Sequence, residues 1–211
     1  MSSIALVGDS IFDNKIYVGD GPDVAAHLRA ALPESWRVTL CAVDGTTTKD
    51  VGHQFDRIPE HTTHVVLSLG GNDGLENADL LGALPVATLG DAIDVIRDRV
   101  EAFRESYGWV LDALVDLGRP LTVCTIYDAN IPGEEGRRAR TALGLFNDVI
   151  IRCAVERSID VLDLRSVCTE PADYANEIEP GVHGGEKIAR AIAGVLGAAD
   201  STRSASVASL V

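Results

Sequence analysis

Short apolar runs alternate with longer amphipathic segments along most of this chain. Five runs have the length and composition of strands, and they cover residues 3–7, 36–41, 64–69, 121–126 and 159–164. Helical patterns extend near residues 23–31, 89–117, 137–157 and 186–196. Such alternation is typical of a parallel sheet with helices on both faces. We therefore predict an α/β fold, a three-layer α/β/α sandwich around a five-stranded parallel sheet.

A flavodoxin-like strand order of 2-1-3-4-5 would place the first three strands side by side, so that the loops after them converge at one edge of the sheet. The 211 residues, of which 46% are hydrophobic, suffice for one domain with its own core. We assign residues 1–198 to this domain. Residues 199–211 are small and polar with scattered apolar groups, which predicts a flexible tail.

Four polar or flexible positions follow the predicted strands. Ser10 ends the first strand in the order Gly8-Asp9-Ser10, Gly45 lies in the turn after the second, Asn72 follows the third, and His183 precedes the last helix. Each position taken alone fits a turn, a helix cap or a surface residue just as well. Together, at one sheet edge, they supply a nucleophile, hydrogen-bond donors and a base.

With these residues the chain resembles the SGNH hydrolases, also called GDSL-type esterases or lipases. The matching blocks are Gly8-Asp9-Ser10, Gly45, Gly70-Gly71-Asn72-Asp73 and His183, in the family's order. The resemblance implies that Ser10 is the nucleophile and His183 the base. It also implies an oxyanion hole made of the Ser10 N–H, the Gly45 N–H and the Asn72 side-chain amide.

One position departs from the family's pattern. The aspartate that usually stands three residues before the histidine is replaced by Pro180. Glu179, one residue further back, is the candidate substitute, and Glu177 is a poorer one. A backbone carbonyl, or a dyad without any acid, are the alternatives.

The chemistry expected from this set is hydrolysis of a carboxylic oxygen ester or thioester, with a short acyl chain, through an acyl group on Ser10. A neighbouring base must take the serine proton, and donors must be in place for the oxyanion. We expect Asp9, Asp73 and Leu75 to contact substrate, and no cofactor or metal to be needed. The leucine-rich segment 74–88 is expected to form an apolar acyl-pocket wall, a short helix, or both. Residues 128–136 are expected to form a mobile loop beside the site.

Charge and motif content exclude several other classes. A net charge of −14 argues against nucleic acid or an anionic membrane as partner. No phosphate-binding or dinucleotide-binding glycine motif follows the first strand, and Phe12 breaks the Gly-x-Ser-x-Gly elbow of ordinary α/β-hydrolases. No signal-like segment opens the sequence, which makes a cytoplasmic location the default expectation. The four cysteines show no metal-ligand spacing, so we expect buried free thiols.

Two other functions remain open on the sequence. The first is a non-catalytic ligand-binding protein on the same fold, which the departure at Pro180 keeps possible. The second is a carbohydrate deacetylase, for which the apolar segment 74–88 is poorly suited unless it turns away from the site.

Overall fold

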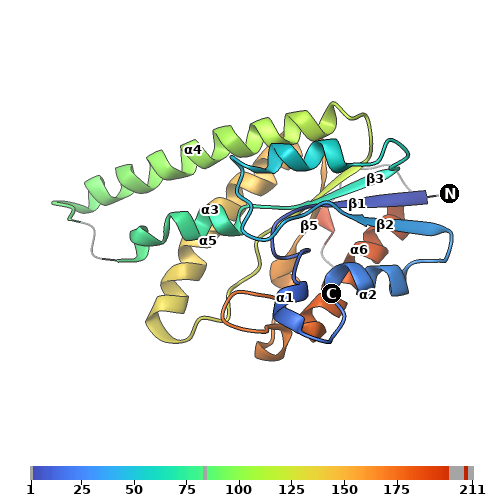
Figure 1. Ribbon diagram of the computed structural model, residues 1–211. Coiled ribbons are helices and arrows are strands. Elements are labelled where there is room, and N and C mark those ends of the chain that lie inside the picture. The colour runs from blue at the N-terminus through green and yellow to red at the C-terminus, as the bar shows by residue number, and fades with distance from the viewer. Residues whose placement is uncertain (1, 83–84, 200–206, 209–211) are drawn as a thin grey trace.

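The computed structural model describes residues 2–82, 85–199 and 207–208, and within them the chain forms the predicted three-layer α/β/α sandwich (Figure 1). All strands of the central sheet run parallel. The strands are β1 (Ser2–Gly8), β2 (Trp36–Leu40), β3 (His64–Ser68), β4 (Leu121–Cys124), β5 (Asp160–Leu162) and β6 (Val207–Ala208). The order β2-β1-β3-β4-β5-β6 contains the predicted order 2-1-3-4-5 and adds one two-residue strand next to β5.

That added strand lies in the segment predicted to be a flexible tail. Val161 and Leu162 of β5 pair with Val207 and Ala208. The other residues of the tail, 200–206 and 209–211, lie outside the described residues.

Helices cover both faces of the sheet because successive side chains of each strand point to opposite sides. Ala5 and Val7 of β1 pack into the core under α4 and α5, whereas Ile4 and Leu6 pack into the core under α2 and α6. The helices are α1 (Lys15–Val18), α2 (Val24–Ala31), α3 (Gly71–Glu76), α4 (Leu89–Val115), α5 (Gly133–Glu156) and α6 (Val182–Ala199). Short 3₁₀ helices are η1 (Val51–Arg57), η2 (Ala78–Leu81), η3 (Leu164–Ser166) and η4 (Pro171–Asp173).

Two helices begin earlier than their sequence patterns indicate. α5 starts at Gly133, so the predicted loop 128–136 is shorter than expected; Glu134 and Glu135 in its first turn favour that start, because carboxylates stabilise a helix N-terminus. α6 starts at Val182, which puts His183 in its first turn. Glycine is a poor helix former, but a Cβ atom at Gly184 would lie 2.1 Å from the backbone oxygen of Asp173, so only glycine fits this close approach.

All four cysteines, Cys41, Cys124, Cys153 and Cys168, are free and buried, as predicted. Among the helices of the described ranges, none is both long and apolar enough to cross a membrane.

Candidate active site

The end of β1 fixes Ser10 at the carboxyl edge of the sheet. Gly8 has φ +134°, and a Cβ atom there would lie 1.7 Å from the backbone oxygen of Ser68 on β3, so the two backbones meet only because Gly8 has no side chain. The N–H of Asp9 then donates to that same oxygen at 3.1 Å. The turn that follows leaves Ser10 nearly buried, at 7% exposure.

Glu179 is the side chain that the structure brings to Ser10. The Ser10 hydroxyl donates a hydrogen bond of 3.1 Å to Oε1 of Glu179, whose residue is also 7% exposed. Within the described residues, the other carboxyl oxygen, Oε2, is buried with no hydrogen-bond partner. Burial raises the pKa of Glu179 to about 7, the hydrogen bond from Ser10 works in the opposite direction, and the nearby charge of Asp44 adds to the increase.

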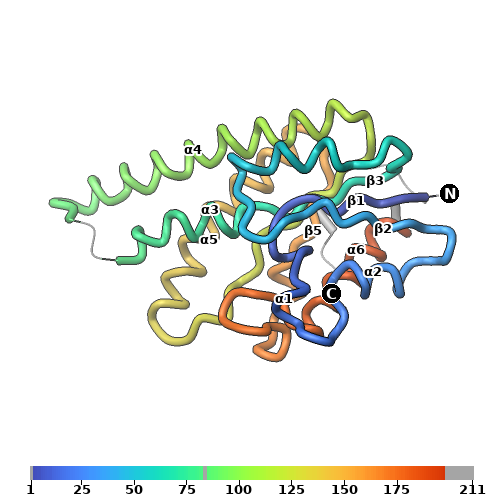
Figure 2. Tube along the Cα trace, in the orientation of Figure 1, coloured from blue at the N-terminus to red at the C-terminus, as the bar shows by residue number. Residues whose placement is uncertain are grey.

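The backbone around Glu179 is held by polar contacts on several sides. Its own N–H donates to Oδ1 of Asn176 at 2.8 Å, and the hydroxyl of Tyr127 donates to the carbonyl of the residue before it. The carbonyl of Pro180 accepts from Nδ2 of the fully buried Asn14 at 3.0 Å. In Figure 2 the orange loop before α6 accordingly passes beside the dark-blue segment around α1. These contacts fix the backbone that carries the Glu179 side chain.

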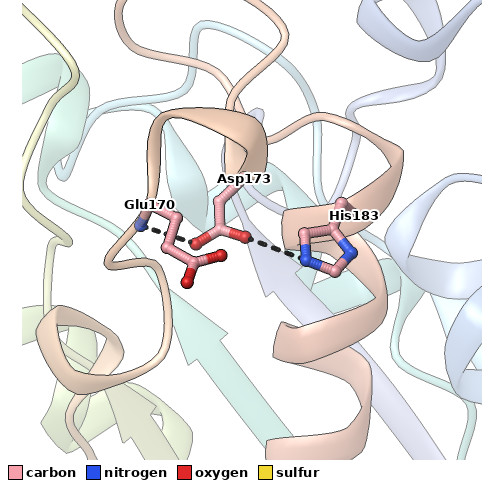
Figure 3. Close-up of side chains that lie close together, drawn as sticks. All are labelled: Glu170, Asp173 and His183. Carbon is pink, nitrogen blue, oxygen red and sulfur yellow. Dashed lines mark hydrogen bonds and ion pairs between the residues drawn. The ribbon is translucent and has the colours of Figure 1, made fainter.

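His183 lies elsewhere, with its ring turned toward Asp173 (Figure 3). Nε2 of His183 is 3.7 Å from Oδ1 of Asp173, which is fully buried, and the histidine side chain is 52% exposed. Within the described residues, no hydrogen bond joins His183 to Ser10. The carboxylate beside the imidazole is therefore Asp173 and not Glu179.

Glu170, Asp173 and His183 form a cluster whose ligand atoms lie close enough together for a metal ion, as Figure 3 shows. A cation of the protein already faces these carboxylates, because Nζ of Lys187 is 2.8 Å from Asp173 Oδ1 and 3.4 Å from Glu170 Oε2. Asp173 Oδ2 also accepts the N–H groups of Thr169 and Glu170, each at 3.0 Å. The arrangement fits a charge-compensated helix junction better than a metal site.

Two of the three residues expected to form the oxyanion hole, Gly45 and Asn72, are linked through Thr46, the residue after Gly45. The Thr46 carbonyl accepts from Nδ2 of Asn72 at 3.0 Å, which leaves the second amide hydrogen of Asn72 available. Gly45 has φ +79°. Neither the N–H of Gly45 nor that of Ser10 donates to another protein group in the described part of the chain. Asn72 and Ser10 line the same pocket, whereas Gly45 is not among its lining residues.

A buried glutamine that sequence reasoning missed connects two of these loops. Nε2 of Gln54 donates to the Gly8 carbonyl at 2.8 Å and to the Thr46 hydroxyl at 3.1 Å, while its Oε1 accepts the Gly8 N–H at 2.9 Å. Gln54 is fully buried. It follows no strand and belongs to no motif, so nothing in its local sequence indicates this role.

The residues expected to contact substrate divide into two groups. Asp9 and Leu75 line the pocket together with Ser10. Asp73 does not: its carboxylate accepts both the N–H and the hydroxyl of Thr48, at 3.1 and 2.5 Å, and so ties α3 to the loop after β2. Burial raises the pKa of Asp9 to about 8, partly offset by the N–H of Ile11, so this carboxyl holds its proton near neutral pH.

The pocket beside Ser10 has a volume of about 180 Å³ and a mostly apolar wall. One side comes from α3 and η2, within the leucine-rich segment 74–88, and the other from α5. The part of that segment up to Leu81 is thus both largely helical and part of the pocket, whereas residues 83–84 lie outside the described residues. The apolar lining includes Leu75, Leu80, Leu81, Ala139, Leu143 and Phe146.

The chain is similar to known proteins in sequence pattern and in fold. Residues 6–191 match the model of the GDSL-like lipase/acylhydrolase family. No curated protein matches the chain significantly.

Among solved structures, an extracellular lipase from Streptomyces rimosus is 19% identical with a TM-score of 0.68, over 94% of this chain and all of the other. A lipase from a goat rumen metagenome is 16% identical with a TM-score of 0.71, over 96% and 99% of the two chains. An acetylxylan esterase from Geobacillus stearothermophilus is 18% identical with a TM-score of 0.65, over 90% and 92%. Identities this low show a shared fold.

Proposed function

Because the chain belongs to the GDSL-like lipase/acylhydrolase family, and is therefore a hydrolase that acts on esters, we propose that it hydrolyses neutral carboxylic esters with an apolar acyl group, through an acyl group on Ser10. The observation that carries this proposal is the pairing of the Ser10 hydroxyl with a buried carboxylate, 3.1 Å away, on the wall of an apolar pocket. A serine hydroxyl becomes a competent nucleophile when an adjacent base takes its proton.

Oxyanion stabilisation is assigned to the N–H groups of Ser10 and Gly45 and to the free amide hydrogen of Asn72. Preorganised donors of this kind each contribute about a hundredfold to a thousandfold in rate. The bond from Asn72 to the Thr46 carbonyl supports the assignment, because it holds the amide in one orientation. Two side chains compete for the role of base: the sequence pattern favours His183, and the geometry favours Glu179.

The pocket supports a somewhat longer acyl chain than the short one expected from the sequence. Its volume is about 180 Å³, and apolar side chains of α3, η2 and α5 make up most of its wall, which favours burial of more than an acetyl group. Glu135 and Glu179 also line the pocket, and their negative charges disfavour an acyl group that carries its own carboxylate. The substrate class supported best is a neutral ester of a short to medium fatty acid.

The test is hydrolysis of p-nitrophenyl acetate, butyrate, hexanoate and decanoate by the wild type and by Ser10→Ala, both checked for folding by circular dichroism. We expect kcat/KM to rise from acetate to hexanoate and to fall at decanoate, with activity lost in Ser10→Ala. Cleavage of acetylated xylooligosaccharides in preference to all of these esters would favour a carbohydrate deacetylase. No cleavage of any of them, with no fluorophosphonate labelling, would favour a binding protein.

A further inference from the structure

We propose that Glu179 is itself the general base, taking the proton of the Ser10 hydroxyl directly, and that His183 lies outside the path of proton transfer. This inference rests on the ester hydrolysis proposed above and assigns one chemical role within it. A serine–carboxylate dyad then replaces the serine–histidine pair that the sequence motif implies.

Distance is the first argument. A general base must lie within about 2.6–3.2 Å of the atom whose proton it takes. Oε1 of Glu179 meets this condition at 3.1 Å from Ser10 Oγ. The His183 ring is instead directed at Asp173 and half exposed to solvent.

The surroundings of the Glu179 carboxylate oxygens also favour a role as base. Its Oε2 atom is buried and has no hydrogen-bond partner, and within the described residues no Lys or Arg side chain forms an ion pair with Glu179. A carboxylate with only one hydrogen bond is poorly stabilised in its charged form and therefore gains by accepting a proton. A merely structural glutamate in the same place would be expected to pair both oxygens.

The surroundings reinforce this basicity. The ionisable groups around Glu179 are Asp9 on the turn after β1, Asp44 on the loop after β2, Tyr17 on α1 and Tyr127 after β4. All four are acids, and none carries a positive charge that would hold Glu179 ionised. A pKa of about 7 for Glu179 agrees with this environment and suits a base that works near neutral pH.

The reaction balances without any other titrating group. Ser10 Oγ forms a bond to the ester carbonyl carbon, its proton moves to Glu179 Oε1, and the carbonyl π electrons move onto the oxygen. When the tetrahedral intermediate collapses, the bond to the alcohol oxygen breaks and that oxygen takes the proton from Glu179. Water then attacks the acyl group, gives a proton to Glu179, and releases the acid as Ser10 Oγ recovers that proton.

The experiment compares Glu179→Gln with His183→Ala, using p-nitrophenyl hexanoate and Ser10→Ala as the baseline. We expect Glu179→Gln to lower kcat/KM by about a hundredfold or more, which is the range for loss of general-base catalysis. His183→Ala should stay within about threefold of the wild type. A loss of a hundredfold in His183→Ala, or an activity of Glu179→Gln within tenfold of the wild type, would overturn the inference.

A pH profile keeps the inference testable if Glu179→Gln does not fold. The wild-type profile alone does not identify which residue is the base. The rate at which a fluorophosphonate labels His183→Ala, measured against pH, does identify it. A labelling rate that increases with pH through about 7 supports Glu179 as the base, and a rate without that dependence contradicts this assignment. A wild type that neither hydrolyses esters nor accepts the label would instead contradict the proposed function.

Discussion

The hydroxyl of Ser10 donates a hydrogen bond to the carboxylate of Glu179 although 169 positions separate the two residues along the chain. The N-terminal strand delivers the serine, and the loop before the last helix delivers the glutamate. Both groups are nearly buried and both line the apolar pocket. The pairing thus places a proton acceptor beside the serine nucleophile, on the wall of the pocket that we propose binds the ester.

Replacing Glu179 by glutamine should stabilise the fold at alkaline pH. The pKa of this carboxyl is about 7 in the fold against 4.5 when exposed, so the native state binds more protons between these values and loses stability as the pH rises through them. Glu179→Gln removes that cost, which is at most about 3 kcal/mol. Thermal unfolding should show a Tm gain at pH 8.5 that shrinks toward zero at pH 4.5. An equal gain at both pH values would contradict the charge-based explanation.

Shortening one leucine of the pocket wall should shift acyl-chain preference. Leu143 on α5 lines the pocket, and its Cδ2 lies 3.1 Å from where a Cβ atom at Gly74 would stand. Leu143→Ala enlarges this space, so we expect kcat/KM for decanoate to rise several-fold relative to hexanoate. Leu145→Ala is the matched control, because Leu145 is on the same helix but is not among the residues that line this pocket. Equal chain-length profiles in the two variants would place the acyl chain elsewhere.

Loss of the Gln54 side-chain amide should cost both stability and activity. Gln54→Leu leaves the Gly8 N–H without its partner, whereas the Gly8 carbonyl keeps the N–H of Val43 at 3.1 Å. An unsatisfied buried group costs about 1–3 kcal/mol, so we expect the free energy of unfolding to fall by about that amount. Urea denaturation measures this, with the exposed neighbour His53→Leu as a control that should change little. A Gln54→Leu variant as stable as that control would show that the bridge contributes nothing.

Chelation should leave ester hydrolysis unchanged. Lys187 supplies the positive charge between Glu170 and Asp173, so a metal ion has no place in the proposed reaction. Activity after dialysis against EDTA, compared with activity after adding zinc or manganese, provides the measurement. An activity that falls with EDTA and returns with one metal would require a different account of this cluster.

The fold was largely predictable because the strand-forming runs are short, apolar and regularly spaced. Positions at strand ends were predictable for the same reason: Ser10 and Asn72 line one pocket, and Gly45 adjoins Asn72 through Thr46. Helix starts were less predictable. α6 begins at Val182 although glycine has a low helix propensity, because Gly184 packs closely against the backbone of Asp173.

The partners of Glu179 and His183 depend on how the loop before α6 folds. An isolated bridge between Tyr174 and Pro180 brings the two ends of this loop together, and the Asn14 amide holds Pro180. A spacing rule places a carboxylate beside the histidine along the sequence. In the folded loop that carboxylate is Asp173, ten positions upstream, and Glu179 is directed to Ser10. Contacts of this kind arise from long-range packing, which local sequence does not encode in a readable form.

The central claim, that Ser10 carries the acyl group, is tested most directly by mass spectrometry of the protein after reaction with a fluorophosphonate. We predict a single adduct on the wild type, mapped to the peptide that contains Ser10, and none on Ser10→Ala. A wild-type protein that hydrolyses esters but carries no adduct, or carries one on another residue, would contradict the claim.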